Sequence, residues 1–463
     1  MKIQHSRRDF LKQCLATAGG LAAFSALAPL TRLTRAHGSG MVTRDRYYVV
    51  VYFAGGWDIL VGLDPRDPAK FTNGNLNATR IQPGYDLLRS ASVPTTLTPK
   101  GPGPLRATPS GIVLGPHIGD LATHDDKLCV VRGMSMETLT HDAGRRRFLT
   151  GKPPSGIQAR GSSGASWLAA TVGKDDPIPN LSVRVEAFNV DLPGYATALK
   201  VDSVPDLVRA LRPDQPLLDD QLARQLDAFM KSAASCPAPS RSQAWQSAEG
   251  ARVRARGITS AGYGKVFDFL AQTPEMDKLR GHYGINNDLT TPEAQAATAG
   301  RAIMSGVSRV SSYMAANALD THYEDWQTQQ GPGQERGFNT VARLIEDLAA
   351  TEYKGSGTSW LDHTTIIGFS EFSRTAMLND RNGRDHSLTN ACFLAGAGVR
   401  GGTVVGRSSD VGMTPQAIDL TTGQPSPAGD VPRPEHVWQA LFEDVGLSTE
   451  PDLRVRPLKA AFR

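Results

Sequence analysis

A nearly continuous run of β-branched and aromatic residues, Tyr47–Phe53 (YYVVVYF), limits the possible folds more than any other feature of the chain. A strand that is apolar at every position, rather than at alternate positions, suits a sheet covered on both faces, as between two layers of helices. Ala54-Gly55-Gly56 then breaks the run. The sequence therefore predicts an α/β fold in which this strand is buried on both faces.

Other segments alternate between strand and helix patterns, which favours a mostly parallel sheet. Apolar side chains recur on one helical face from Phe338 to Leu348, and again from Val437 to Val445 after Pro434, a residue typical of a helix start. The further segments with a strand pattern are 127–131, 181–185, 364–369 and 391–395.

The interior of the chain has a different pattern. From Val204 to Tyr283 the sequence predicts helices without strands, and residues 92–116 form a Pro/Gly/Thr-rich stretch typical of a long surface loop. We expect the apolar stripe of this interior region to pack in a core; it consists of Leu218, Leu222, Leu226 and Phe229. The simplest architecture is one α/β domain over residues 41–463, with a helical insertion over about 204–300.

The amino-terminal residues predict export. Ser6–Lys12 (SRRDFLK) is a twin-arginine motif, and the apolar run Leu15–Leu30 is too short and too weakly hydrophobic to anchor the chain in a bilayer. We expect residues 1–36 to be a signal peptide read by the twin-arginine translocase, and the mature protein to reside in the periplasm or cell envelope. That route carries folded proteins, often with a metal already bound.

The charge of the remaining chain excludes one class of partner. The formal net charge of the 463 residues is +4, but residues 1–36 hold six Lys/Arg and one Asp, so the rest has a net charge of −1. A near-neutral chain gives no case for nucleic-acid binding. No later stretch approaches about 18 consecutive apolar residues, so we expect no membrane span in the mature protein.

Acidic and imidazole side chains follow the predicted strands. In open α/β sheets, functional groups gather beyond the carboxyl ends of the strands. Carboxylates and imidazoles bind zinc, manganese or magnesium without thiolates. Two close ions can clamp the attacking and leaving oxygens of an ester. The side chains in question are Asp58, His141, Asp320, His322, Glu371, Asp385 and His386.

Several motifs along the chain resemble those of one bacterial family, the twin-arginine-exported DUF1501 proteins, which are grouped with the alkaline phosphatase and sulfatase superfamily. The resemblance implies an alkaline-phosphatase-like three-layer α/β/α sandwich with a mostly parallel central sheet. The matching segments are FAGGWD at 53–58, DTH at 320–322, FSEFSRT at 369–375, GRDH at 383–386, and AGAGV at 395–399 with Gly401-Gly402.

The resemblance also implies ligands for one or two divalent ions, which would be zinc, manganese or calcium. Asp58 is similar to the superfamily's metal-binding aspartate after the first strand, and Asp320 and His322 to its central Asp and His ligands. Glu371 falls where the superfamily often has an Asp-His pair. The last ligand would be His386, together with Asp385.

The resemblance also implies a place for a nucleophile. Arg147–Gly151 resembles the helix that follows the nucleophile in sulfatases, which would place the nucleophile near Thr140 or His141, at a helix amino terminus suited to an anion. Thr140 could attack as a metal-activated hydroxyl or could only cap the helix. Arg145, within a run of three arginines, could neutralise a phosphate or sulfate. The Cys-x-Pro-Ser-Arg signature of sulfatases is absent.

Two functions follow from these residues. The first is a metal-dependent hydrolase that acts on a phosphate or sulfate ester, either a small molecule or a polymer. The second is a non-catalytic envelope protein for binding or assembly that retains the fold. Both require the scattered acids and imidazoles to converge when the chain folds.

Overall fold

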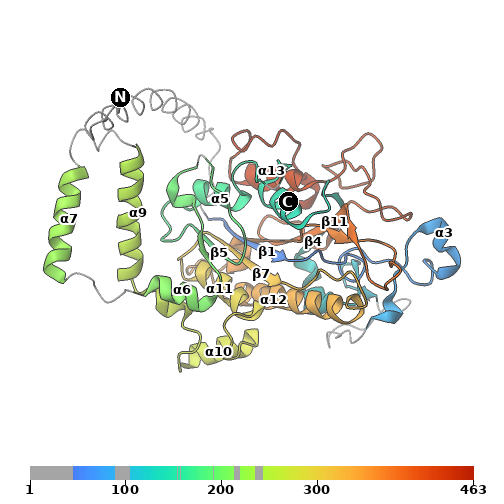
Figure 1. The fold of residues 1–463 in the computed structure, drawn as a ribbon, viewed down its shortest axis with the longest axis horizontal. Helices are drawn as coiled ribbons and strands as arrows, with labels where there is room; N and C mark the ends of the chain where they lie inside the picture. Colours follow the sequence, from blue (N-terminus) through green and yellow to red (C-terminus); the bar gives the residue numbers. More distant parts are fainter. Residues whose placement is uncertain are drawn as a thin grey trace, which may run out of the picture.

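The central element of the fold is a sheet of eight strands, seen in a computed structural model that describes residues 45–88, 105–212 except 154, 157 and 191, 219–234, and 243–463 (Figure 1). The strand order is β12-β4-β11-β8-β1-β7-β5-β6. All neighbouring strands run parallel except β11, which is antiparallel to both β4 and β8. The strands are β1 (Tyr47–Phe53), β4 (Leu128–Ser135), β5 (Asn180–Val183), β6 (Leu199–Val201), β7 (Val310–Ala316), β8 (Thr364–Phe369), β11 (Thr389–Gly396) and β12 (Thr403–Val405).

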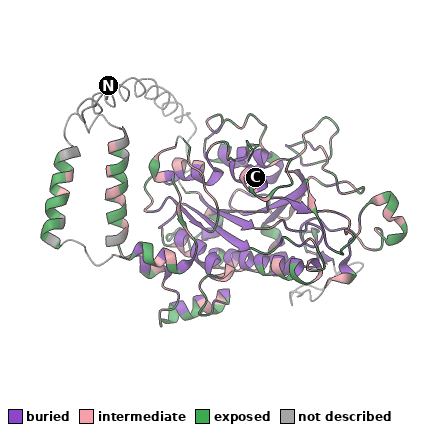
Figure 2. Ribbon diagram, in the orientation of Figure 1, coloured by how far each residue is buried: buried purple, intermediate pink, exposed green. Residues whose placement is uncertain are grey.

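Strand β1 is buried on both faces, as predicted, and every one of its residues is buried (Figure 2). Tyr47, Val49, Val51 and Phe53 belong to one hydrophobic core, whereas Tyr48, Val50 and Tyr52 belong to a second core on the other side of the sheet. This split follows from the period of two along a strand, which turns successive side chains to opposite faces.

Helices cover both faces of the sheet (Figure 1). On one face, α11 (Pro292–Met304) and α12 (Gly331–Ala350) contribute to the core that contains Val49. On the other face, α4 (His141–Thr150), α5 (Gly164–Val172) and α13 (Pro434–Asp444) contribute to the core that contains Val50. The helix predicted from the Phe338–Leu348 periodicity is α12, and the helix predicted to begin at Pro434 is α13.

The strand pattern of the sequence located most of the sheet but missed β7, which lies between β1 and β5. Its sequence, VSSYMAA, carries few β-branched or aromatic residues, so its burial comes from its neighbours rather than from its own hydrophobicity. This strand matters for function because it leads directly to Asp320 and His322. The short strands β6 and β12 were also missed.

Between β6 and β7 the described residues form helices and no strands. The helices are α6 (Val204–Leu211), α7 (Asp220–Ala234), α9 (Gln243–Ser260), α10 (Pro274–Tyr283) and α11. In Figure 1, α7 and α9 stand as a pair beyond one end of the sheet, whereas α11 packs against β7. Within the described part of the chain, every helix is too short or too polar to cross a membrane.

The apolar stripe of α7 does not pack in a core, contrary to expectation. Leu222, Leu226 and Phe229 are exposed, Phe229 by 67%. Helix α7 is tied to α9 through Asp227, which forms ion pairs with Arg252 and Arg256. An amphipathic pattern identifies a helix and its apolar face, but it does not tell whether another element covers that face.

Two predictions lie outside the described residues. These are the signal peptide over residues 1–36, and Leu218 of the apolar stripe. The loop predicted over 92–116 is described from residue 105 onward, where β2 (Arg106–Ala107) and β3 (Val113–Leu114) form a short antiparallel pair.

Candidate metal centre

Loops that follow β1, β4, β7 and β8 meet at one edge of the sheet. These strands are parallel, so their carboxyl ends lie on the same side. His141 is reached after β4, Asp320 and His322 after β7, and Glu371 after β8. His386 arrives from the opposite direction, just before the antiparallel strand β11 begins.

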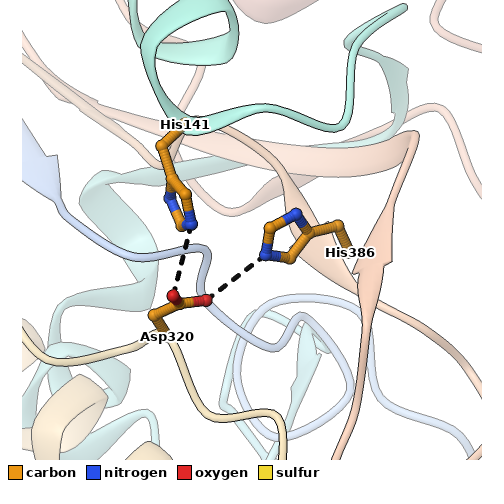
Figure 3. Close-up of side chains that lie close together, drawn as sticks. All are labelled: His141, Asp320 and His386. Carbon is orange, nitrogen blue, oxygen red and sulfur yellow. Dashed lines mark hydrogen bonds and ion pairs between the residues drawn. The ribbon is translucent and has the colours of Figure 1, made fainter.

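Three of these side chains form a compact cluster (Figure 3). One ligand atom from each of His141, Asp320 and His386 lies within 4.8 Å of the other two. Nε2 of His141 is 3.4 Å from Oδ2 of Asp320, and Nε2 of His386 is 3.3 Å from Oδ1 of the same carboxylate. A carboxylate between two imidazole nitrogens is a suitable arrangement for a divalent ion.

His322 adds a fourth group to this cluster. Its Nε2 lies 3.0 Å from Oδ1 of Asp320 and 3.0 Å from Nε2 of His386. Three imidazole Nε2 atoms therefore face a single carboxylate. We call His141, Asp320, His322 and His386 the His/Asp cluster.

Each imidazole of the His/Asp cluster is held from behind through its Nδ1 atom. Nδ1 of His141 is 2.9 Å from Oε1 of Glu371, and Nδ1 of His322 is 3.0 Å from Oδ1 of Asp385. Nδ1 of His386 is 2.6 Å from the carbonyl oxygen of Leu139. A neutral imidazole whose proton is on Nδ1, facing such an acceptor, has its Nε2 lone pair available for a metal ligand bond, as in most protein metal sites. Nε2 of His322 also lies 3.4 Å from Nη1 of Arg374.

Glu371 is buried and joins three parts of the chain at this edge. Besides His141, its Oε1 accepts the backbone N–H of Gly55 at 2.8 Å, and its Oε2 accepts the hydroxyl of Ser370 at 3.0 Å. Helix α4 packs directly on its backbone, because a Cβ added at Gly144 would lie 2.3 Å from the carbonyl oxygen of Glu371. Glu371 and Asp385, predicted as ligands, are thus placed as orienting groups behind His141 and His322.

Arg374 connects the loops that carry the cluster through hydrogen bonds. Its guanidinium is fully buried and donates to Oδ1 of Asp320 at 2.8 Å. It also donates to backbone carbonyls of the loops after β1 and β7, which belong to Gly55, Gly56 and Leu319. In β9 (Ser373–Arg374), this residue pairs with His386 of β10 (His386–Ser387), so the guanidinium and the imidazole are neighbours.

The environment sets the protonation of the cluster. Burial alone would raise the pKa of Asp320, but the hydrogen bonds from Arg374 and His386 outweigh it and lower the pKa to about 2. Burial lowers the pKa of His386, and the hydrogen bond to Glu371 raises the pKa of His141. The hydrogen bond with His322 lowers the pKa of Asp385. Asp320 is therefore ionised at neutral pH and His386 neutral, the states that metal binding requires.

The donor set of the cluster fits a transition-metal ion. Three imidazole nitrogens and one carboxylate suit zinc or manganese, whereas calcium takes oxygen ligands. The cluster is also accessible, because the side chains of His141, His322 and Asp320 are 36%, 30% and 49% exposed. Within the described residues, His141, Asp320 and His386 are the one group of three or more such side chains with ligand geometry.

Asp58 does not belong to the cluster, and its predicted role as a ligand is corrected. Its side chain is fully buried and lies against the equally buried Arg384, with Oδ2 3.0 Å from Nε. The same oxygen accepts Nε1 of Trp326 at 2.8 Å, and Oδ1 accepts the backbone N–H of Leu60 at 2.9 Å. A carboxylate with these partners serves the packing of the loop rather than an ion.

The three predicted catalytic residues lie in different surroundings, and only one of them is in the cluster. His141 lies in the cluster. Thr140 immediately precedes α4 as its N-cap, but its side chain makes no capping hydrogen bond and lies 3.4 Å from the hydroxyl of Thr138. Arg145 is ion-paired with Glu186 at 2.9 Å and with Asp142, so its charge is already balanced.

Two residues with a role at the site were missed in the sequence. Arg374 lies in the motif at 369–375, and an arginine so close to Glu371 after a buried strand is a usable signal. The second residue is Asn379, whose Nδ2 donates to the carbonyl of His322 at 2.9 Å and to Oδ1 of Asp385 at 3.3 Å. An asparagine in a polar loop gives no signal by itself.

Comparisons with known proteins identify one matching family. The model of the family described as "Protein of unknown function (DUF1501)" matches residues 45–422. No curated protein matches the chain. A solved structure titled "Crystal structure of Ps i-CgsB in complex with k-i-k-neocarrahexaose" is 11% identical, over 89% of this chain and 75% of its own, with a TM-score of 0.30. A likeness that weak carries no argument about this chain.

Proposed function

The chain belongs to the DUF1501 family, and we propose that it is an exported metal-dependent hydrolase of a phosphate or sulfate ester. One observation carries the proposal: the Nε2 atoms of His141, His322 and His386 face the Asp320 carboxylate at an accessible edge of the sheet. A group of this kind, at the carboxyl ends of parallel strands, lies where α/β enzymes place their chemistry.

The four residues of the His/Asp cluster would hold a zinc or manganese ion. When bound, such an ion supplies Lewis acidity toward an ester oxygen. Asp320 contributes the negative charge that stabilises a cation, and the hydrogen bond from Arg374 favours its ionised form. Glu371, Asp385 and the Leu139 carbonyl fix the orientation of the three imidazoles. The exposed side of His141 and Asp320 leaves access for a substrate.

The finer classification is part of this proposal. We assign the chain to the alkaline phosphatase and sulfatase superfamily and its fold to the α/β/α sandwich of that superfamily. The mostly parallel sheet with helices on both faces supports this assignment. The motif Ser6–Lys12 supports export by the twin-arginine translocase to the periplasm or cell envelope.

A second function is favoured by one observation around α4. Each of its three consecutive arginines is ion-paired with an acidic residue. Among the described residues, the hydroxyl of Thr140 has only Thr138 as a side-chain partner. A site with no anion-neutralising arginine on α4 and no evident nucleophile also suits a non-catalytic envelope protein that uses the ion for binding or assembly. The hydrolase remains our proposal, because the cluster is accessible.

Elemental analysis together with an ester assay tests the proposal. We expect protein purified without added metal to contain about one zinc or manganese per chain, and to hydrolyse p-nitrophenyl phosphate or p-nitrophenyl sulfate. His322→Ala should lose both metal and turnover, whereas Glu346→Gln, an acid remote from the cluster, should keep both. Metal without turnover of either ester would support the binding protein, and absence of metal would contradict both functions.

A further inference from the structure

Recognition of an anionic substrate needs a positive charge that is not already balanced. The three arginines of α4 and the buried Arg374 do not provide it. The ion pairs and hydrogen bonds that occupy them are Arg145–Glu186, Arg146–Glu186, Arg147–Glu137, Arg147–Glu435 and Arg374–Asp320.

Arg381 is a different case. It is exposed, and among the described residues no acidic side chain forms an ion pair with it. Its guanidinium carbon instead lies 4.9 Å from the centre of the Tyr323 ring. Tyr323 directly follows His322, and the centres of their two rings are 6.5 Å apart. A guanidinium held over an aromatic face keeps its donors free at its edge.

The backbone of Arg381 is fixed to the His/Asp cluster by Asn379. Oδ1 of Asn379 accepts the N–H of Arg381 at 3.0 Å, while its Nδ2 donates to the His322 carbonyl and to Asp385. The loop that contains Arg381 and Gly383 also packs against the backbone of His322. A Cβ added at Gly383 would lie 2.2 Å from the His322 carbonyl. The same contacts that orient His322 therefore position Arg381.

We propose that Arg381, supported by Tyr323, is the residue through which this site recognises the oxyanion of its substrate. This inference rests on the proposed function and narrows it. A tetrahedral oxyanion, either phosphate or sulfate, would accept hydrogen bonds from the fork of the guanidinium, an arrangement that a lysine does not reproduce. Tyr323 limits the conformations of the side chain, so less freedom is lost when the anion binds.

The test compares Arg381→Ala, Arg381→Lys and Tyr323→Leu with wild type. The control is Arg209→Ala, which removes an exposed arginine from α6, where it pairs with Asp206. The measurements are metal content, the Kd of inorganic phosphate and of sulfate, and kcat and KM for p-nitrophenyl phosphate, p-nitrophenyl sulfate and the neutral ester p-nitrophenyl acetate. The two anions distinguish a phosphate site from a sulfate site.

We expect Arg381→Ala to weaken anion binding and raise KM for the matching anionic ester roughly tenfold. In Arg381→Ala, metal content and kcat/KM for the neutral acetate ester should stay within about twofold of wild type, because neither depends on a contact with an oxyanion. Arg381→Lys should recover part of the loss, and Tyr323→Leu should lose less than Arg381→Ala.

The inference and the proposed function can fail separately. If wild type binds an anion through Arg381 but turns over no ester, the inference holds and the hydrolase is wrong. If wild type hydrolyses an anionic ester and Arg381→Ala changes neither KM nor anion binding, the inference is wrong. It is equally wrong if wild type binds neither anion, or if acetate hydrolysis falls by the same factor.

Discussion

Nδ1 of His141 lies 2.9 Å from Oε1 of Glu371, and this contact joins α4 to the end of β8. The same glutamate oxygen accepts the N–H of Gly55 after β1. One buried carboxylate therefore sets the position of an imidazole in the His/Asp cluster relative to two strands of the sheet.

The acids behind the imidazoles should tune metal binding without abolishing it. Glu371→Gln and Asp385→Asn each weaken the hold on one imidazole, so we expect zinc affinity to fall by roughly 10–100-fold. Substitution of His141, His322 or His386 by Ala should cost more, because a ligand is lost. Competition with a chromophoric chelator measures both effects. Unchanged affinity in Glu371→Gln would show that His141 does not need this partner.

Substitution of Asp58 should lower the stability of the fold and leave metal binding unchanged. Asp58→Asn removes the buried partner of Arg384, so we expect the free energy of unfolding to fall by about 3–5 kcal/mol. The control Asp206→Asn breaks an exposed pair with Arg209 and should cost less than about 1 kcal/mol. Urea unfolding and elemental analysis give the two readouts. Loss of the metal in a stably folded Asp58→Asn variant would restore Asp58 as a ligand.

Gly144 should be intolerant of a side chain. A methyl group there collides with the carbonyl oxygen of Glu371, so Gly144→Ala must move α4 and with it His141. We expect lower stability by about 1–3 kcal/mol and weaker metal binding. Gly257→Ala in α9 is the matched control, since nothing lies within 4 Å of its Cβ position, and it should stabilise its helix by up to about 1 kcal/mol. Equal effects of the two substitutions would contradict the packing of α4 on Glu371.

The pairing of Glu186 with Arg145 and Arg146 predicts a pH dependence of stability. Burial raises the pKa of Glu186, but the hydrogen bonds from the two arginines outweigh it, and the folded-state pKa lies below the unfolded value. A lowered pKa stabilises the fold above the unfolded value and loses that effect as pH falls. Relative to wild type, Glu186→Gln should cost about 0.5–1 kcal/mol at pH 7 and progressively less below about pH 4. If the loss of stability in Glu186→Gln did not change with pH, the ion pairs of Glu186 with Arg145 and Arg146 would not be the cause of that loss.

Much of the fold could be predicted from segments whose own hydrophobicity requires burial. The run Tyr47–Phe53 is apolar throughout and consists of valine, tyrosine and phenylalanine, which suits a strand between two layers. Strand β7 could not be predicted, because its serines and alanines are buried by neighbours that are distant in the sequence. The stripe around Phe229 was assigned to a core because periodicity marks an apolar face but not its partner.

The site was predictable to the extent that it follows the ends of strands. Asp320, His322 and His386 were identified as ligands, and the structure brings them together. His141 was assigned to catalysis because the segment after it resembles the helix that follows the nucleophile in sulfatases. Its position in the sequence does not show which atoms its ring faces. Asp58 was assigned as a ligand because it resembles the superfamily's aspartate after the first strand. Nothing near it in the sequence reveals the guanidinium of Arg384 that it meets in the fold.

The central claim is that His141, Asp320, His322 and His386 hold one divalent ion. An anomalous difference map from crystals grown with zinc tests this most directly. We predict a single strong peak among the three Nε2 atoms and the Asp320 carboxylate, about 2.0–2.2 Å from each ligand. Zinc bound elsewhere on the chain, with no peak at this cluster, would contradict the claim.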